Sequence, residues 1–139
     1  MSIETRASIC DWLAFSADSQ RADLMDPNLT TTDLIEFLVQ LRVYRPQPQS
    51  VLVTSVHSDH PTIDGPDGHN PGGNAIDFVD NLGAPEHLLA DVQKCPNARG
   101  IGAGGSYQQY AAALGGYSPE SKLFEDNNSD HIHVQVVGY

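Results

Sequence analysis

The chain has 139 residues, of which 40% are hydrophobic and 18% are charged. This size and composition predict one folded domain with a core of ordinary size. The formal net charge is −11 with only seven lysines and arginines. Non-specific binding to nucleic acid or to an anionic membrane is therefore not expected, since both partners require basic surfaces.

Neither an export signal nor a disulfide scaffold is apparent. The first 25 residues contain no apolar run long enough for a signal peptide, and no later stretch is long enough for a membrane span. We therefore expect the chain not to direct its own export. Cys10 and Cys95 are too few for a thiolate zinc site. Buried free thiols are the favoured interpretation, and a Cys10–Cys95 disulfide is the alternative.

The first half of the chain predicts two helices, a strand and a loop. Irregular apolar spacing indicates a helix over about residues 5–16. A second helix is expected over 30–44, because Leu34, Phe37, Leu38 and Leu41 form one apolar stripe, and Thr30 with Asp33 resembles a capping box. Residues 50–56 are β-branched and predict a buried strand. Residues 57–72 are rich in Asp, Gly, Pro and His and predict a long loop, a type that is often functional.

The second half predicts further strands and helices. Residues 74–80 alternate as a strand, and residues 84–95 form a helix with Leu88, Leu89 and Val92 facing the core. We then expect a glycine-rich strand or turn at 98–105, a short helix at 106–116, a polar loop at 118–130 and a strand at 131–137. The predicted fold class is α+β, a small and mostly antiparallel sheet with flanking helices. Residues 1–29 are expected to be a helical extension of a domain at 30–139.

The segment GIGAGG at 100–105 fits the dinucleotide-binding pattern G-x-G-x-x-G only formally. It follows KCPNA, which does not predict the strand that a βαβ unit needs. Close packing of a strand or a tight turn is the better interpretation of these glycines.

Histidines are the residues most suggestive of chemistry. His87 is expected on an exposed helix surface. His57 and His60, in the loop after the first strand, are candidates for surface or substrate contacts. His131 and His133 share one face of a strand, because side chains two residues apart point the same way.

A metal site is predicted from His69, Asp77 and His133. Imidazole nitrogen and carboxylate oxygen are good zinc ligands, and three protein ligands with an open fourth position are typical of catalytic zinc. The glycines at 72 and 73 would let the chain turn from His69 into the strand of Asp77. Asp130 is the expected general base, and His131 would stabilise an oxyanion or orient a ligand.

The elements HNPGGNAID and DHIH resemble the motifs of the zinc peptidases of peptidoglycan. These are the D-Ala-D-Ala carboxypeptidases, the D,D-dipeptidases and the L-Ala-D-Glu endolysins, which share a fold with the Hedgehog signalling domain. The resemblance covers about residues 30–139. It implies zinc on His69, Asp77 and His133, catalysis by Asp130, and hydrolysis of peptidoglycan stem peptides.

The sequence departs from the family pattern in its loop, in its general base, where Asp130 replaces the usual Glu, and in a substrate-binding arginine. The glycine of Gly-x-Ala-x-Asp lies four residues after His69, one more than is usual, and the family's Ser-x-x-Arg has Ser55 but no arginine. Ser55, His57 and His60 are the candidate substrate contacts in its place. A phage product, either an endolysin that reaches the wall from the host cytoplasm or a virion domain among tail components, would need no signal peptide. The alternative function is a non-catalytic metal-binding module for structure or attachment.

Overall fold

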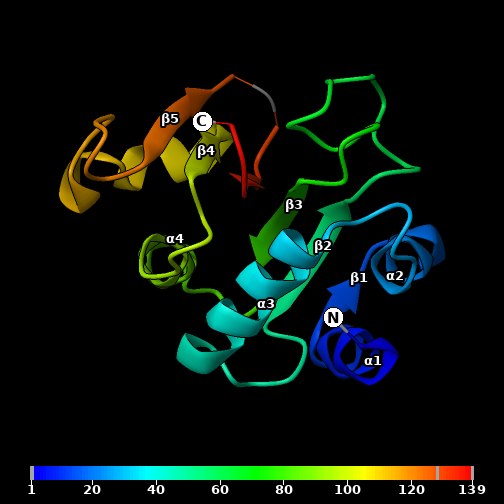
Figure 1. Ribbon diagram of the computed structural model, residues 1–139. Helices are drawn as coiled ribbons and strands as arrows, with labels where there is room; N and C mark the ends of the chain where they lie inside the picture. The colour runs from blue at the N-terminus through cyan, green and yellow to red at the C-terminus, as the bar shows by residue number, and fades with distance from the viewer. Residues whose placement is uncertain (1, 128, 139) are drawn as a thin grey trace.

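A single six-stranded sheet organises the computed structural model, which describes residues 2–127 and 129–138 (Figure 1). Across the sheet the strands follow the order β1-β2-β3-β6-β4-β5. Their bounds are β1 Ala14–Phe15, β2 Val51–Ser55, β3 Ala75–Asp80, β4 Gly100–Gly104, β5 Leu123–Asp126 and β6 Ile132–Gln135. The chain is therefore α+β, as the sequence predicted.

The expectation of a small, mostly antiparallel sheet is wrong, because the sheet is mixed. The three inner pairings are antiparallel, whereas β1 pairs with β2 and β5 pairs with β4 in parallel. Both parallel pairings involve edge strands that the sequence analysis did not anticipate. β1 lies inside the helix expected over 5–16, and β5 lies inside the polar loop expected over 118–130, of which residue 128 is outside the described residues. Strands this short carry too little alternation to be detected without their partners.

In the described part of the chain, four α-helices and two 3₁₀ helices accompany the sheet: α1 Ile3–Trp12, α2 Asp18–Met25, α3 Thr32–Tyr44, α4 Pro85–Gln93, η1 Gly105–Tyr110 and η2 Ala112–Leu114. The segment expected as one short helix over 106–116 is thus two 3₁₀ turns, and α2 was not predicted. Among the described residues no helix combines the length and the apolar character that crossing a membrane would require.

The start of α3 differs by one residue from the expected capping box. Thr31 is the N-cap, and its hydroxyl accepts the backbone N–H of Leu34. Thr30 is instead fully buried, where its hydroxyl accepts a hydrogen bond from the Arg6 guanidinium at 2.8 Å. The tertiary contact with Arg6 therefore decides which of the two adjacent threonines caps the helix.

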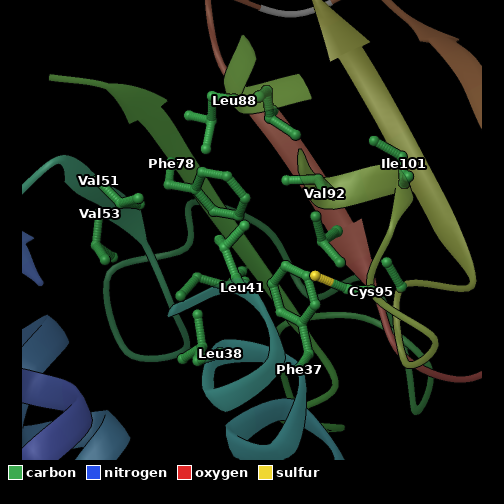
Figure 2. Close-up of a cluster of buried hydrophobic side chains, with 14 of the residues drawn as sticks. Phe37, Leu38, Leu41, Val51, Val53, Phe78, Leu88, Val92, Cys95 and Ile101 are labelled. Atoms are coloured by element: carbon green, nitrogen blue, oxygen red, sulfur yellow. The ribbon is translucent and has the colours of Figure 1, made fainter. Parts of the chain in front are cut away.

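Helices α3 and α4 contribute the side chains that pack onto one face of the sheet. Figure 2 shows Phe37 and Leu41 of α3 beside Phe78 of β3, with Leu88 and Val92 of α4 completing the cluster. The rings of Phe37 and Phe78 stack with centroids 6.2 Å apart. Burial of these apolar side chains is the main favourable term for the fold.

Several side chains of residues 2–29 belong to the same cluster of buried side chains. Ile9, Trp12 and Leu24 are members of it, and β1 adds a strand to the sheet beside β2. This segment therefore contributes to the core through both its side chains and its backbone.

The opposite face of the sheet carries polar side chains because strand residues alternate. Ile132 and Val134 of β6 are buried in the core, whereas His133 between them points to the other face. His133 lies directly across from Asp77 of β3 on one side and from Gly102 of β4 on the other. This polar face is where the predicted ligands meet.

Candidate metal centre

Three predicted ligands converge on the polar face of the sheet. The imidazole Nε2 of His69 lies 3.1 Å from Asp77 Oδ1 and 3.2 Å from His133 Nδ1. His133 Nδ1 lies 2.9 Å from the same carboxylate oxygen. Asp77 and His133 are cross-strand neighbours in β3 and β6, so the sheet register places them. His69 arrives from the loop over 57–74.

Loop hydrogen bonds fix the position of His69. Its Nδ1 lies 2.6 Å from the carbonyl oxygen of Val56, the residue that follows β2. The Asp64 carboxylate accepts the backbone N–H groups of His69 and Asn70 at 3.0 and 2.8 Å. Burial raises the pKa of Asp64, but these two hydrogen bonds outweigh burial and the net pKa is lowered. A charged Asp64 thus closes the turn that carries His69.

Glycines allow the chain to pass from His69 into β3. A Cβ on Gly72 would lie 1.9 Å from the carbonyl oxygen of Pro66. Gly73 has a φ of +65°, and a Cβ there would lie 2.3 Å from the carbonyl oxygen of Leu29. Only glycine tolerates both the positive φ and the close backbone approach. The turn expected from the sequence between His69 and Asp77 is therefore present.

The hydrogen bonds of the two imidazoles determine which nitrogens point at the centre. His69 donates its Nδ1 proton to Val56, so its neutral form presents a lone pair at Nε2. His133 Nε2 lies 2.9 Å from Gln135 Oε1 and donates there, which leaves the lone pair on Nδ1. Together with the Asp77 carboxylate, three lone pairs face one point. Such an arrangement is repulsive unless a proton on His133 Nδ1 or a metal ion occupies that point.

The dimensions of the triangle suit a metal ion. Ligand atoms at about 2.0–2.1 Å from a tetrahedral ion stand about 3.3 Å from one another. The three distances between the ligand atoms here are 2.9–3.2 Å. His69 is fully buried and Asp77 is 8% exposed, so little water competes at these atoms. His69, Asp77 and His133 could therefore hold a metal ion.

The pKa shifts at the centre also favour the binding of a cation. Burial raises the pKa of Asp77, but the hydrogen bonds with His133 and His69 dominate and hold it below its usual range. Burial lowers the pKa of His133, but its contact with the Asp77 carboxylate dominates and raises it. Asp77 is therefore a permanent negative charge that attracts a cation to the centre, whether a proton on His133 or a metal ion.

His131 lies beside the three ligands and contacts Asp126, a residue that the sequence analysis did not select. Its Nε2 lies 3.2 Å from Asp126 Oδ2 and 3.8 Å from Asp77 Oδ1. Asp126 is the last residue of β5. Because β5 was expected to be a loop, nothing in the sequence brought Asp126 to this face.

Gly102 of β4 leaves room for the aromatic ring of Phe124, which lies beside the metal centre. Phe124 of β5 lies across Gly102, where a Cβ would stand 2.9 Å from two of its ring atoms. The Phe124 ring meets the ring of His133 edge-on, with centroids 6.0 Å apart. The glycine-rich segment at 100–105 thus serves close packing in a strand, which is the interpretation favoured over a dinucleotide-binding loop.

The other candidate residues occupy different positions. Ser55 and His60 line the cavity at the centre, and the ring of His60 stacks on that of His69 with centroids 4.0 Å apart. His57 is not among the lining residues. Asp130 is exposed, does not line the cavity, and accepts the backbone N–H of Ser106 at 2.8 Å.

The centre opens into a cavity of about 690 Å³ with an acidic lining. Five carboxylate residues contribute to it, and no lysine or arginine does so among the residues that the structure describes: Asp59, Asp64, Asp77, Glu125 and Asp126. A second group of possible ligands, His60, Asp64 and His69, lies at the same cavity. It shares His69 with the first group.

Comparison of the chain with family models, with curated proteins and with solved structures found no match. The two cysteines are buried free thiols, which excludes the alternative of a Cys10–Cys95 disulfide in this structure.

Proposed function

We propose that this chain is a zinc-dependent peptidase whose active centre is formed by His69, Asp77 and His133. The observation that carries the proposal is the convergence of two imidazole nitrogens and one carboxylate oxygen at 2.9–3.2 Å from one another, a spacing that suits the ligands of one metal ion. Two imidazoles and one carboxylate favour zinc among the common divalent ions. Three protein ligands leave a position open towards the cavity, as catalytic sites require.

The metal ion would supply Lewis acidity, which polarises a substrate carbonyl and favours ionisation of a water molecule. The chain itself supplies proton transfer. His131 Nε2 faces this region, and its contact with the Asp126 carboxylate keeps the ring in place. His131 is thus positioned to hold a proton at Nε2 and to pass it to the amine that leaves when an amide bond is hydrolysed.

This assignment gives Asp130 a different role from the one that the sequence suggested. Its carboxylate caps Ser106 at the start of η1, and a Cβ on Gly105 would clash with it at 1.8 Å. We propose that Asp130 orders this turn and that proton transfer belongs to His131. Peptidoglycan stem peptides remain the proposed substrate class, supported by the resemblance of HNPGGNAID and DHIH to the peptidase motifs.

The test compares three variants of the purified, zinc-loaded protein on peptidoglycan stem peptides, with amine release as the assay. His131→Ala is expected to retain zinc and lose about 10²-fold or more in kcat. Asp130→Ala is expected to stay within a few-fold of the parent. His87→Ala, an exposed residue of α4, is the control.

Three results would change the assignment. A loss of activity in Asp130→Ala alone would restore Asp130 as the general base. One zinc per chain with no hydrolysis by the parent would favour the non-catalytic attachment module. Less than about 0.2 zinc per chain would refute the assignment of a metal centre, since a three-ligand site predicts nearly one zinc ion per chain.

A further inference from the structure

Gln135 is the last residue of β6 and lies beside one ligand of the centre. Side chains two residues apart on a strand point to the same face, so Gln135 and His133 share the polar face of the sheet. His133 Nε2 lies 2.9 Å from Gln135 Oε1, whereas His133 Nδ1 lies 2.9 Å from Asp77 Oδ1. Gln135 therefore reaches the predicted metal position through the ring of His133.

The residues beside Gln135 on the neighbouring strands are small. The sheet register places Gln135 opposite Ala75 of β3 and opposite Gly100 of β4. Neither residue has a polar side chain that could compete for the amide. Among the described residues, His133 is the only hydrogen-bond partner of the Gln135 side chain. The surroundings thus leave this amide to the imidazole of His133.

The orientation of the amide decides which imidazole nitrogen is free to bind a metal ion. With Oε1 towards the ring, Gln135 accepts the Nε2 proton, and the lone pair of His133 stays on Nδ1. A donor in the same place would occupy the lone pair of Nε2 and leave the proton on Nδ1, where it would face Asp77. Only the first tautomer can bind a metal ion through Nδ1, since a ligand nitrogen must carry no proton.

The other histidine of the centre is held in the same way, but by the backbone. His69 Nδ1 lies 2.6 Å from the carbonyl oxygen of Val56 and donates its proton there. A substitution of Val56 would leave that acceptor in place. At His133 the acceptor is a side chain, so a single substitution removes it and its contribution can be measured.

We infer that Gln135 is a positioning residue whose amide oxygen holds His133 in the tautomer that binds the metal ion through Nδ1. The inference rests on the metal centre of the proposed function and adds to it a residue outside the three ligands. Hydrogen-bond partners of metal-bound histidines typically contribute about 10- to 100-fold in metal affinity. The zinc affinity of this centre should therefore depend on Gln135.

The experiment measures zinc affinity by competition with a chromophoric chelator. Gln135→Met removes the acceptor, keeps the length of the side chain, and is expected to weaken zinc binding about 10- to 100-fold. Gln135→Glu keeps an acceptor oxygen at this place and should bind zinc at least as tightly as the parent. Gln47→Met makes the same replacement at an exposed glutamine before β2 and should bind zinc as the parent does.

A spectroscopic measurement separates this positioning role from a general structural one. In the zinc-loaded parent, NMR of labelled histidine rings should show a proton on His133 Nε2 that exchanges slowly with water, because Gln135 accepts it. Gln135→Met should lose this protection from exchange, and Gln135→Glu should keep it. A loss of zinc affinity that Gln135→Glu does not restore would indicate a structural role and would overturn the inference.

The outcomes also distinguish this inference from the peptidase proposal. If the parent binds zinc but hydrolyses no stem peptide, the peptidase proposal fails, and the zinc affinities still test the role of Gln135. If Gln135→Met binds zinc within about threefold of the parent, the inference fails even where the parent is an active peptidase. A parent that binds no zinc overturns both.

Discussion

The replacement Asp77→Asn tests whether the metal centre is real, because it should lower the melting temperature much more with zinc than without it. In the metal-free protein the carboxylate oxygen faces the lone pairs of His69 and His133 at 3.1 and 2.9 Å. An asparagine of the same shape can donate an N–H to one of them. Asparagine still loses the charged contact that raises the pKa of His133, so at pH 8 the metal-free variant is expected to melt slightly below the parent, by no more than about 4 °C.

With zinc the parent gains stability that the variant does not. An ion at one hundred times its dissociation constant stabilises the folded state by about 2.7 kcal/mol. An unfolding entropy of about 2.1 cal/mol/K per residue over 139 residues converts this to a rise in Tm of about 9 °C. Loss of the charged ligand should reduce the rise to less than about 3 °C at the same zinc concentration.

The assay is thermal unfolding followed by circular dichroism, with chelator and then with excess zinc. Asp67→Asn, which removes a charge from an exposed residue of the same loop, is the matched control and should keep the full rise. An equal zinc-dependent rise in Asp77→Asn and the parent would refute the ligand assignment. A metal-free Asp77→Asn that melts more than about 4 °C below the parent would show that the variant is damaged without zinc, and would refute the expectation that the asparagine amide replaces most of the carboxylate contact.

Two further predictions concern packing and buried thiols. Gly102→Ala places a Cβ 2.9 Å from the Phe124 ring and 3.1 Å from His133 Cβ, so it should lower the free energy of unfolding by about 1–3 kcal/mol and weaken zinc binding. Adding Phe124→Ala to the same chain should relieve the clash with the ring. If the two substitutions instead give additive losses in denaturant unfolding, this contact is contradicted. Burial raises the pKa of Cys10 to about 11 and that of Cys95 to about 12, so neither thiol should react with a thiol reagent at pH 8 until the protein unfolds. The free energy of unfolding should fall as the pH rises above about 9, because the thiols ionise at lower pH in the unfolded chain than in the folded one. Replacing either cysteine with alanine should make this decrease smaller. Stoichiometric labelling of the native protein would disprove the thiol prediction.

The elements that the sequence predicted best are those with strong periodicity and a clear boundary. The stripe containing Phe37 and Leu41 corresponds to α3, and the apolar face of Leu88 and Val92 corresponds to α4. β2, β3 and β6 also lie within their expected segments. In each case the side chains that face the core are a local pattern, so no knowledge of the partner was needed.

The edge strands and the helix cap depended on distant contacts. β5 has four residues, and its identity as a strand comes from parallel pairing with β4. The choice between Thr30 and Thr31 as the cap was made by Arg6, which is 24 residues from Thr30. Neither contact leaves a signature in the local sequence.

In the metal centre too, some features follow from the local sequence and others depend on distant contacts. Residue types and spacing alone selected His69, Asp77 and His133, because alternation puts His133 on a polar face and glycines permit the turn before Asp77. The tertiary structure decided that their ligand atoms meet: Asp77 and His133 are paired only once β3 and β6 are adjacent, and loop contacts bring His69 to them. It also decided that Asp126 holds His131 while Asp130 turns to Ser106. A sequence lists the groups that can do chemistry, whereas their distances depend on strand pairings between residues that are far apart in the chain.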